Sequence, residues 1–396
     1  MKVEWRQSTP RKIQVFAGSD NPDVRPDMED LLTSEDVDHI AEIFQTPLTG
    51  SYNWNYAVQD DRIKKLYDLG KQLNWDPEID IDWDRPFPEF DAAAQAEIMN
   101  LSDYPPYMAL SDEEKHQFWL HNSSWSLSQF LHGEQGALLV ASQLCSCAPT
   151  LNAKLYAGSQ TFDEARHVEV FNKYLQQRMG MMYPINTHLK SIIDKILTDA
   201  RWDMKFIGMQ IVIEGLALSA FNTTRETTPD PVLKDVVYLV TRDEARHVTF
   251  GVNYLEEFIK SLSDEEKEER ALFAYEACVV SRERLVMTDV FAHFGWDVED
   301  ARRRVLDGFV MSTFRNLLFQ RVVPNLKRIG LMTDKIRPKF EELGILEFEN
   351  LATDGDINWT ALERPLDTDE AQSYEQSMLE EFSKKRESEE APSSAA

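Results

Sequence analysis

A glutamate and a histidine three residues apart occur twice in the sequence in identical surroundings. The six-residue string DEARHV recurs at an offset of 243 − 163 = 80 residues. On a helix this spacing places Glu164 with His167, and Glu244 with His247, on one face. Carboxylate and imidazole groups are ligands that iron, manganese and zinc accept. Each copy of the string therefore predicts half of a metal site.

The repeat extends beyond this string and includes two further glutamates. At the same offset Glu134 pairs with Glu214, and Pro149 pairs with Pro229. Each proline lies midway between the two glutamates of its copy, since 149 − 134 = 164 − 149 = 15 and 229 − 214 = 244 − 229 = 15. A turn at the proline would fold two helical arms together, with both glutamates about 22 Å from the turn at about 1.5 Å per residue. We expect two helical hairpins, each bringing two carboxylates level.

The apolar faces of the arms predict that these carboxylates point inward. The face of Glu134 carries Leu127, Phe130, Leu131, Ala137, Leu138, Ala141 and Cys145. The face of Glu214 is also apolar except for Gln210, and neither face carries Lys or Arg. A buried carboxylate costs several kcal/mol unless it is paired or binds a cation. Four glutamates and two histidines with a formal charge of about −4 therefore predict a dinuclear metal site. The set resembles the ligands that di-iron and di-manganese proteins place inside a four-helix bundle.

The six residues resemble the ligands of the ferritin-like di-iron carboxylate superfamily. This superfamily includes ribonucleotide reductase small subunits, multicomponent monooxygenases, acyl carrier protein desaturases and stand-alone oxygenases. The resemblance covers roughly residues 111 to 260. It implies an all-α, ferritin-like bundle whose metal ligands are Glu134, Glu164, His167, Glu214, Glu244 and His247.

The resemblance also implies roles for the remaining charged residues of the repeated string. Asp163 and Asp243 would accept hydrogen bonds from the ligand histidines and orient them. Arg166 and Arg246 would donate hydrogen bonds to nearby carboxylates, with ordinary ion pairs at the end of the bundle as the alternative.

The activity that the resemblance implies is O2-dependent oxidation of a small organic substrate. Two iron ions, or manganese or a mixed Mn/Fe pair, would activate O2 with electrons from an external donor. The reaction would be a hydroxylation, an N-oxygenation or a dehydrogenation. Residues near the ligands are candidate pocket walls, with plain core packing as the alternative; they are Phe130, Leu138, Phe171, Met209, Ala217 and Phe221.

Two alternative functions are a ribonucleotide-reductase-like radical or metal-cofactor subunit and a non-catalytic, metal-binding ferritin-like protein. Phe171 follows Glu164 by seven residues, almost two helical turns, and so lies on the same face of the helix. In the radical-storing subunits that this sequence resembles, a tyrosine usually occupies that place. Phe171 therefore favours an oxygenase.

A stand-alone arylamine N-oxygenase is a further alternative with one departure from the expected pattern. That family resembles this chain but has an additional histidine ligand. The position one turn before Glu244, where this histidine is expected, holds Val240. Elsewhere, Glu113 and His116 have the Glu-x-x-His spacing without a repeated copy, and we expect them in a solvated first helical turn.

Composition divides the chain into four segments. They are an irregular N-terminal wrap packed on the bundle (1–110), the ferritin-like di-metal bundle (111–262), additional C-terminal helices (263–345) and an acidic, largely disordered tail (346–396). The bundle is expected to start at Ser111, where the sequence SDEE predicts a helix-capping box.

Charge and hydropathy limit the partners and the compartment. The net charge of −27 disfavours nucleic acid as a partner. No window approaches the roughly 20 uninterrupted apolar residues of a membrane span, and the first residues lack the apolar segment of a signal peptide. The three cysteines form no Cys-x-x-Cys pair. We expect a cytoplasmic protein without a membrane partner, and the sequence leaves a homodimer open.

Overall fold

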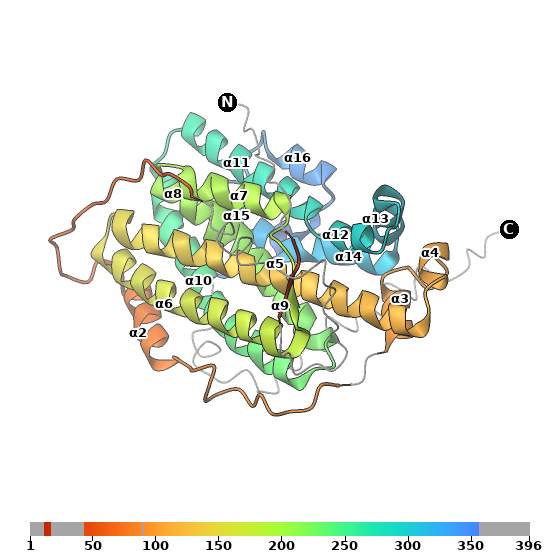
Figure 1. Cartoon of the computed structure of the whole chain (residues 1–396). Helices are drawn as coiled ribbons and strands as arrows, with labels where there is room; N and C mark the ends of the chain where they lie inside the picture. The colour runs from red at the N-terminus through yellow and green to blue at the C-terminus, as the bar shows by residue number, and fades with distance from the viewer. Residues whose placement is uncertain (1–11, 17–42, 89–90, 356–396) are drawn as a thin grey trace.

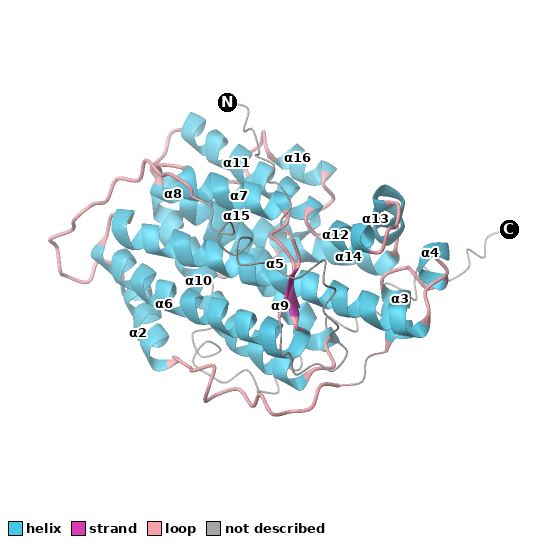
Figure 2. Ribbon diagram, in the orientation of Figure 1, coloured by secondary structure: helices cyan, strands magenta, loops and turns pink. Residues whose placement is uncertain are grey.

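Helices make up most of the described part of the chain. The computed structural model describes residues 12–16, 43–88 and 91–355. In this part of the chain the only strands are the short antiparallel pair β1 (Gln14–Val15) and β2 (Met181–Met182). Figure 2 shows this distribution, with cyan helices throughout. The predicted all-α fold class is confirmed.

Two long helical hairpins form the centre of the molecule (Figure 1). The first consists of α5 (Asp112–Cys147) and α6 (Leu151–Tyr174). The second consists of α9 (Glu214–Thr227) and α10 (Pro231–Lys260). Each hairpin turns at the proline that the repeat indicated, so the predicted ferritin-like bundle of two helical hairpins with flanking helices is confirmed.

The helix starts are fixed by local capping. The hydroxyl of Ser111 accepts from the backbone N–H of Glu114, whose carboxylate accepts from the backbone N–H of Ser111, which completes the predicted capping box. The side chain of Thr150 caps α6, and that of Asp230 caps α10, with Pro231 in the first turn. Short polar side chains thus cap the first turns of α5, α6 and α10.

The connection between the hairpins sets the direction of the second one. After the π-helical segment η1 (Leu175–Met179), helix α7 (Thr187–Thr198) returns along the bundle. The next helix is continuous through α8 (Trp202–Phe206), the π-helical segment η2 (Ile207–Ile213) and α9. Asp163 of α6 lies against His247 of α10, and His167 of α6 lies against Asp243 of α10, so these two helices are antiparallel. Since α9 and α10 are also antiparallel within their hairpin, helices α6 and α9 run in the same direction. Residues one turn before Glu164 and Glu214 therefore lie at the same end of the site.

The continuous helix Trp202–Thr227 is the apolar centre of the bundle. It is long and apolar enough to cross a membrane by length and composition, but 89% of its most apolar window is buried inside the protein. It also carries Glu214. Its apolar character is accounted for by burial in the core of this fold.

The N-terminal segment contributes short helices to the surface of the bundle. The sequence suggested an irregular wrap over 1–110; the described part contains α2 (Asp61–Gln72), α3 (Ala92–Ile98) and α4 (Pro105–Met108). Helix α2 packs on α6 and α10, and its apolar side buries Ile63, Leu66 and Leu69. This packing brings the residues after α2 to the outer side of the predicted site.

The C-terminal part adds helices around the second hairpin. They are α11 (Asp264–Glu283), α12 (Thr288–His293), α13 (Val298–Leu306), α14 (Phe309–Leu317), η3 (Leu318–Gln320), α15 (Val322–Arg328), α16 (Arg337–Glu342) and η4 (Leu346–Asn350). The predicted tail began at 346, yet the chain remains packed through 355, where Asp354 accepts hydrogen bonds from Asn325 and Arg321. The rest of that tail, 356–396, lies outside the described residues.

Candidate metal centre

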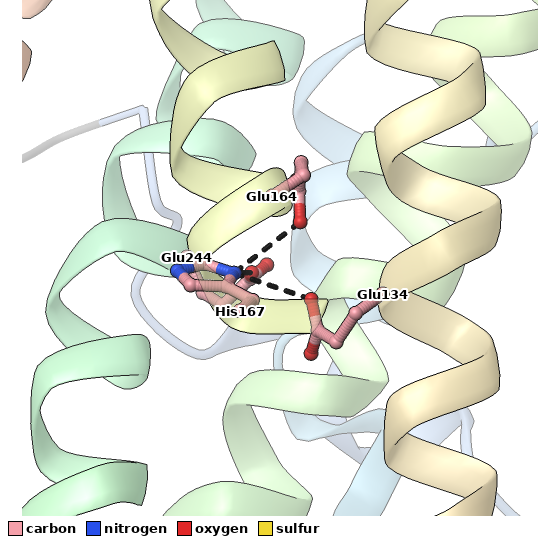
Figure 3. Close-up of side chains that lie close together, drawn as sticks. All are labelled: Glu134, Glu164, His167 and Glu244. Carbon is pink, nitrogen blue, oxygen red and sulfur yellow. Dashed lines mark hydrogen bonds and ion pairs between the residues drawn. The ribbon is translucent and has the colours of Figure 1, made fainter. Parts of the chain in front are cut away.

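The six predicted ligands come together inside the bundle as two overlapping groups. One group contains Glu134, Glu164, His167 and Glu244, and the other contains Glu164, Glu214, Glu244 and His247. In each group the possible ligand atoms lie within 4.8 Å of one another, and every member is buried. Figure 3 shows side chains of the first group converging from α5, α6 and α10. Because Glu164 and Glu244 belong to both groups, their carboxylates lie between the two groups of ligand atoms.

Both histidines direct the same ring nitrogen at the carboxylates. The Nδ1 atom of His167 lies 3.2 Å from Glu134, 3.3 Å from Glu164 and 3.2 Å from Glu244. The Nδ1 atom of His247 lies 3.1 Å from Glu164 and 3.5 Å from Glu244. Each imidazole therefore offers Nδ1 to its group and leaves Nε2 for another partner.

Despite these close contacts, several buried atoms of the two groups form no hydrogen bond of suitable geometry in the described part of the chain. They are Oε2 of Glu164, Oε2 of Glu214, both carboxylate oxygens of Glu244 and Nδ1 of His247. Buried polar atoms without partners are costly, and cations satisfy carboxylate oxygens and imidazole nitrogen together. A donor set of four carboxylates and two imidazoles suits iron or manganese. The residues present thus fit a pair of divalent metal ions.

The electrostatics of the protein without metal point the same way. Burial, with the nearby charge of Glu244, raises the pKa of Glu134 and of Glu214 well above the usual range. Burial would also raise the pKa of Glu164, but His247 and His167 outweigh it, so the pKa of Glu164 is lowered. Cations would replace the protons that Glu134 and Glu214 hold, because metal ligands must be deprotonated.

Each aspartate of the repeated string lies beside the histidine of the other repeat. Asp243 lies 3.2 Å from Nε2 of His167, and Asp163 lies 3.3 Å from Nε2 of His247. The sequence predicted that aspartates orient the histidines, and in the structure each aspartate contacts the histidine of the other repeat. These hydrogen bonds fix the ring so that Nδ1 faces the carboxylates.

The two arginines of the string hold these aspartates. Arg166 donates to Asp163 and Asp243 at 2.7 Å each, and Arg246 donates to Asp243 at 2.6 Å and to Asp163 at 3.1 Å. The side chain of Arg166 is 4% exposed and that of Arg246 is fully buried. The four charges balance, and they form a closed network behind the histidines. These contacts are ion pairs buried beside the histidines.

Sequence reasoning missed two residues that follow α2. The indole Nε1 of Trp75 donates to Asp243 at 2.7 Å, and the side-chain oxygen of Asn74 accepts from Arg166 at 2.5 Å. The guanidinium of Arg166 also lies over the Trp75 ring, 4.8 Å from its centroid. Neither residue belongs to the repeat, so no spacing in the sequence indicated them.

The two ends of the site differ in character. At one end the rings of Phe130, Phe171 and Phe221 pack together, with centroids 4.9 to 5.8 Å apart. Val240 belongs to the same apolar cluster. At the other end lie the buried amides of Gln160 and Gln210.

The six candidate pocket residues are therefore not all brought together. Phe130, Phe171, Ala217 and Phe221 belong to the apolar cluster at the aromatic end. Met209 is buried in a second apolar cluster, which also contains Ile207 and Ile211. Leu138 is partly exposed and belongs to neither cluster. The isolated Glu113 is exposed in the first turn of α5, as expected.

Comparison with known families adds independent evidence. Residues 57–330, more than half of the chain, match the family model described as p-aminobenzoate N-oxygenase AurF. The chain belongs to the AurF family. It is accordingly a ferritin-like di-metal protein and an oxidoreductase that acts with O2, as the sequence predicted.

Solved structures similar to this chain include R2-like ligand-binding oxidases. One, with an aerobically reconstituted Mn/Fe cofactor after a long soak, is 19% identical with a TM-score of 0.45, covering 68% of this chain and 93% of its own. Another, with an aerobically reconstituted metal cofactor after photoconversion, is 18% identical with a TM-score of 0.44, covering 69% of this chain and 94% of its own. No curated protein sequence matches the chain.

Proposed function

We propose that the chain holds two iron ions through Glu134, Glu164, His167, Glu214, Glu244 and His247 and uses them to oxidise a small organic substrate with O2. Manganese or a mixed Mn/Fe pair is the alternative metal content. The observation that carries the proposal is the pair of overlapping, buried ligand groups that share Glu164 and Glu244.

In this proposal the protein residues have distinct tasks. A bound metal pair supplies the electrons for reducing O2 and the oxidising power for the substrate. Glu164 and Glu244 belong to both groups, so they can contact both ions, whereas Glu134 and Glu214 each belong to one. Asp163 and Asp243 keep each imidazole in place through Nε2, and the arginines balance their charge. The surrounding apolar clusters keep bulk water from the ions.

We further propose that the substrate is a small aromatic compound that reaches the ions at the aromatic end. Phe130 and Ala217, from α5 and α9, are partly exposed there, whereas Phe171 and Phe221 are buried. Aromatic rings favour tilted and edge-on contacts with a ring-shaped ligand. The description of the AurF family names an arylamine substrate, p-aminobenzoate, so N-oxygenation of an aromatic amine is the first reaction to test.

Position 240 separates this chain from the expected arylamine N-oxygenase pattern. The additional histidine expected one turn before Glu244 is replaced by Val240, which is fully buried in an apolar cluster. We therefore propose a six-residue ligand set here.

Metal analysis of purified protein tests the ligand set. We expect close to two metal ions per chain, and Glu164→Ala and Glu244→Ala should each lose at least one. Glu113→Ala is the matched control, because Glu113 has the same Glu-x-x-His spacing outside the site. Full metal occupancy in both site variants would refute the proposed ligands.

Oxygen consumption by the fully reduced, iron-loaded protein tests the activity. Aromatic amines, other aromatic compounds and fatty acids should be offered, and products identified by mass spectrometry. We expect an aromatic compound to change the rate of O2 consumption and to be oxidised. If no compound does either, a simple ferroxidase replaces the oxygenase.

The remaining properties follow from the same fold. We propose a soluble, cytoplasmic enzyme that takes electrons from an external donor and has neither nucleic acid nor membrane as a partner. Burial of the most apolar helix inside the bundle and the net charge of −27 support this. A homodimer is compatible with the proposal, and sedimentation analysis would test it.

A further inference from the structure

The internal repeat allows the two halves of the site to be compared position by position. One turn before Glu164 stands Gln160, and the corresponding residue before Glu244 is Val240. One turn before Glu214 stands Gln210, and the corresponding residue before Glu134 is Phe130. The repeat therefore conserves the ligand types but places amides on one side of the site only.

Gln160 bonds directly to two of the carboxylates. Its Nε2 atom donates to Oε1 of Glu214 at 2.8 Å and to Oε1 of Glu164 at 3.1 Å. The side chain is fully buried. Glu214 belongs only to the group that contains His247, whereas Glu164 belongs to both groups. One amide thus holds the two carboxyl groups side by side.

Gln210 supports Gln160 from the neighbouring helix. Its Nε2 atom lies 3.5 Å from Oε1 of Gln160, and its own Oε1 is buried without a hydrogen-bond partner among the described residues. Gln210 lies in η2, against the backbone of Gly251, where an added Cβ would come within 2.5 Å of the Gln210 Cβ. Close packing with α10 therefore keeps the glutamine near Gln160.

The group that contains His167 has no equivalent support. The positions that correspond to Gln160 and Gln210 are Val240 and Phe130, whose side chains cannot donate a hydrogen bond. The Oε2 atom of Glu134 instead lies 3.2 Å from Nδ1 of His167. The two groups have the same donor types but different neighbours.

We propose that Gln160 is a positioning residue that prearranges Glu164 and Glu214 for the metal ion at the His247 position, and that the two metal positions are therefore inequivalent. The inference rests on the proposed ligand set. Two carboxylates that are already side by side lose less conformational freedom when a cation binds. Removing the amide leaves them free to move apart, which weakens binding at that position. Residues that hold metal ligands typically change affinity by about 10- to 100-fold when they are replaced.

Anaerobic titration of the metal-free protein with Co²⁺ tests the inference. Cobalt absorption reports the ligand geometry at each step, and a competing chelator gives the affinities. In the wild type we expect two Co²⁺ ions per chain. In Gln160→Leu the ion at the His247 position should bind about tenfold or more weakly. The other ion should be affected less, because Glu214 belongs only to the His247 group. Gln143→Leu is the matched control, because Gln143 is a buried glutamine whose Nε2 donates to Leu197 instead of to a ligand.

The possible outcomes separate this inference from the proposed function. Wild-type protein that binds fewer than two ions would refute the ligand set itself. Two ions with unchanged or tighter binding in Gln160→Leu would overturn the role of Gln160 alone. An equal loss of affinity in Gln143→Leu would also overturn it. If Gln160→Leu does not fold, Gln210→Leu serves instead, and we expect a smaller weakening at the same position; unchanged binding in that variant would overturn the inference.

Discussion

Replacing Asp243 by asparagine tests whether the network behind the histidines governs metal binding. Asp243 is fully buried and accepts hydrogen bonds from Trp75, Arg166 and Arg246 at 2.6 to 2.7 Å. It also lies 3.2 Å from Nε2 of His167. Asparagine has nearly the same shape, but it carries no charge and its amide nitrogen must face one of these donors. The substitution therefore removes charge balance and one acceptor without creating a cavity.

Two separate losses are expected in Asp243→Asn. Removing one partner of a buried ion pair costs about 3 to 5 kcal/mol of unfolding free energy, because two buried arginines share this carboxylate. Loss of the negative charge that faces Nε2 of His167 should weaken metal binding by about 10- to 100-fold, or about 1.4 to 2.7 kcal/mol. The second loss should appear at the position that His167 serves, in contrast to Gln160→Leu.

Asp203→Asn provides the control for general destabilisation. Asp203 is a buried aspartate on α8 that accepts from Nε of Arg270 at 2.9 Å and contacts neither histidine. Both variants should unfold at lower temperature than the wild type when they are free of metal. Only Asp243→Asn should show weaker Co²⁺ binding in the chelator competition. Wild-type affinity in Asp243→Asn, or an equal loss of affinity in Asp203→Asn, would refute the reasoning.

Three further predictions concern other parts of the molecule. Oxygenation of the reduced protein without substrate should give no long-lived tyrosyl signal by electron paramagnetic resonance. A signal near one spin per chain would instead favour radical storage, and Tyr156→Phe should then remove it, since the Tyr156 ring lies 6.5 Å from that of His247 while Tyr174 is bonded to Asp230. Burial, with the nearby His293, lowers the pKa of His121 to about 3. Between about pH 6.5 and pH 3 the unfolded chain therefore binds more protons than the folded chain. As the pH is lowered through this range, the free energy of unfolding should decrease by up to about 1.4 kcal/mol per pH unit because of this group. Denaturant titrations should show a smaller decrease in His121→Gln, and an unchanged decrease would contradict this. Phe130→Ala should favour bulkier aromatic substrates by about tenfold in relative kcat/KM, and an unchanged ratio would exclude Phe130 from the pocket.

The sequence alone predicted the fold and the cluster of six candidate ligands. The repeat at 80 residues and the midway prolines defined two hairpins, because helical rise and a turn position are local properties. The apolar faces around Glu134 and Glu214 indicated that these carboxylates point inward. The three-residue spacing then placed His167 on the same helix face as Glu164, and His247 on the same face as Glu244. All of these inferences use contacts within one helix or one hairpin.

The comparison of the two repeats also contained a signal that motif analysis did not use. Gln160 and Val240 occupy corresponding buried positions, and a buried amide in only one copy marks a difference in chemistry. Its meaning depends on Gln160 lying beside Glu214, which comes from the other hairpin. A single helical face cannot reveal that contact.

The tertiary structure decided which residues support the ligands. Each aspartate bonds the histidine of the other repeat, and Trp75 and Asn74 reach the network from outside the repeat. These contacts join residues 76 to 168 positions apart in the chain. Periodicity reports which face of a helix is buried, whereas the partner on the opposite side depends on how the hairpins and α2 pack together. The sequence therefore determined the candidate ligands, and packing determined their surroundings.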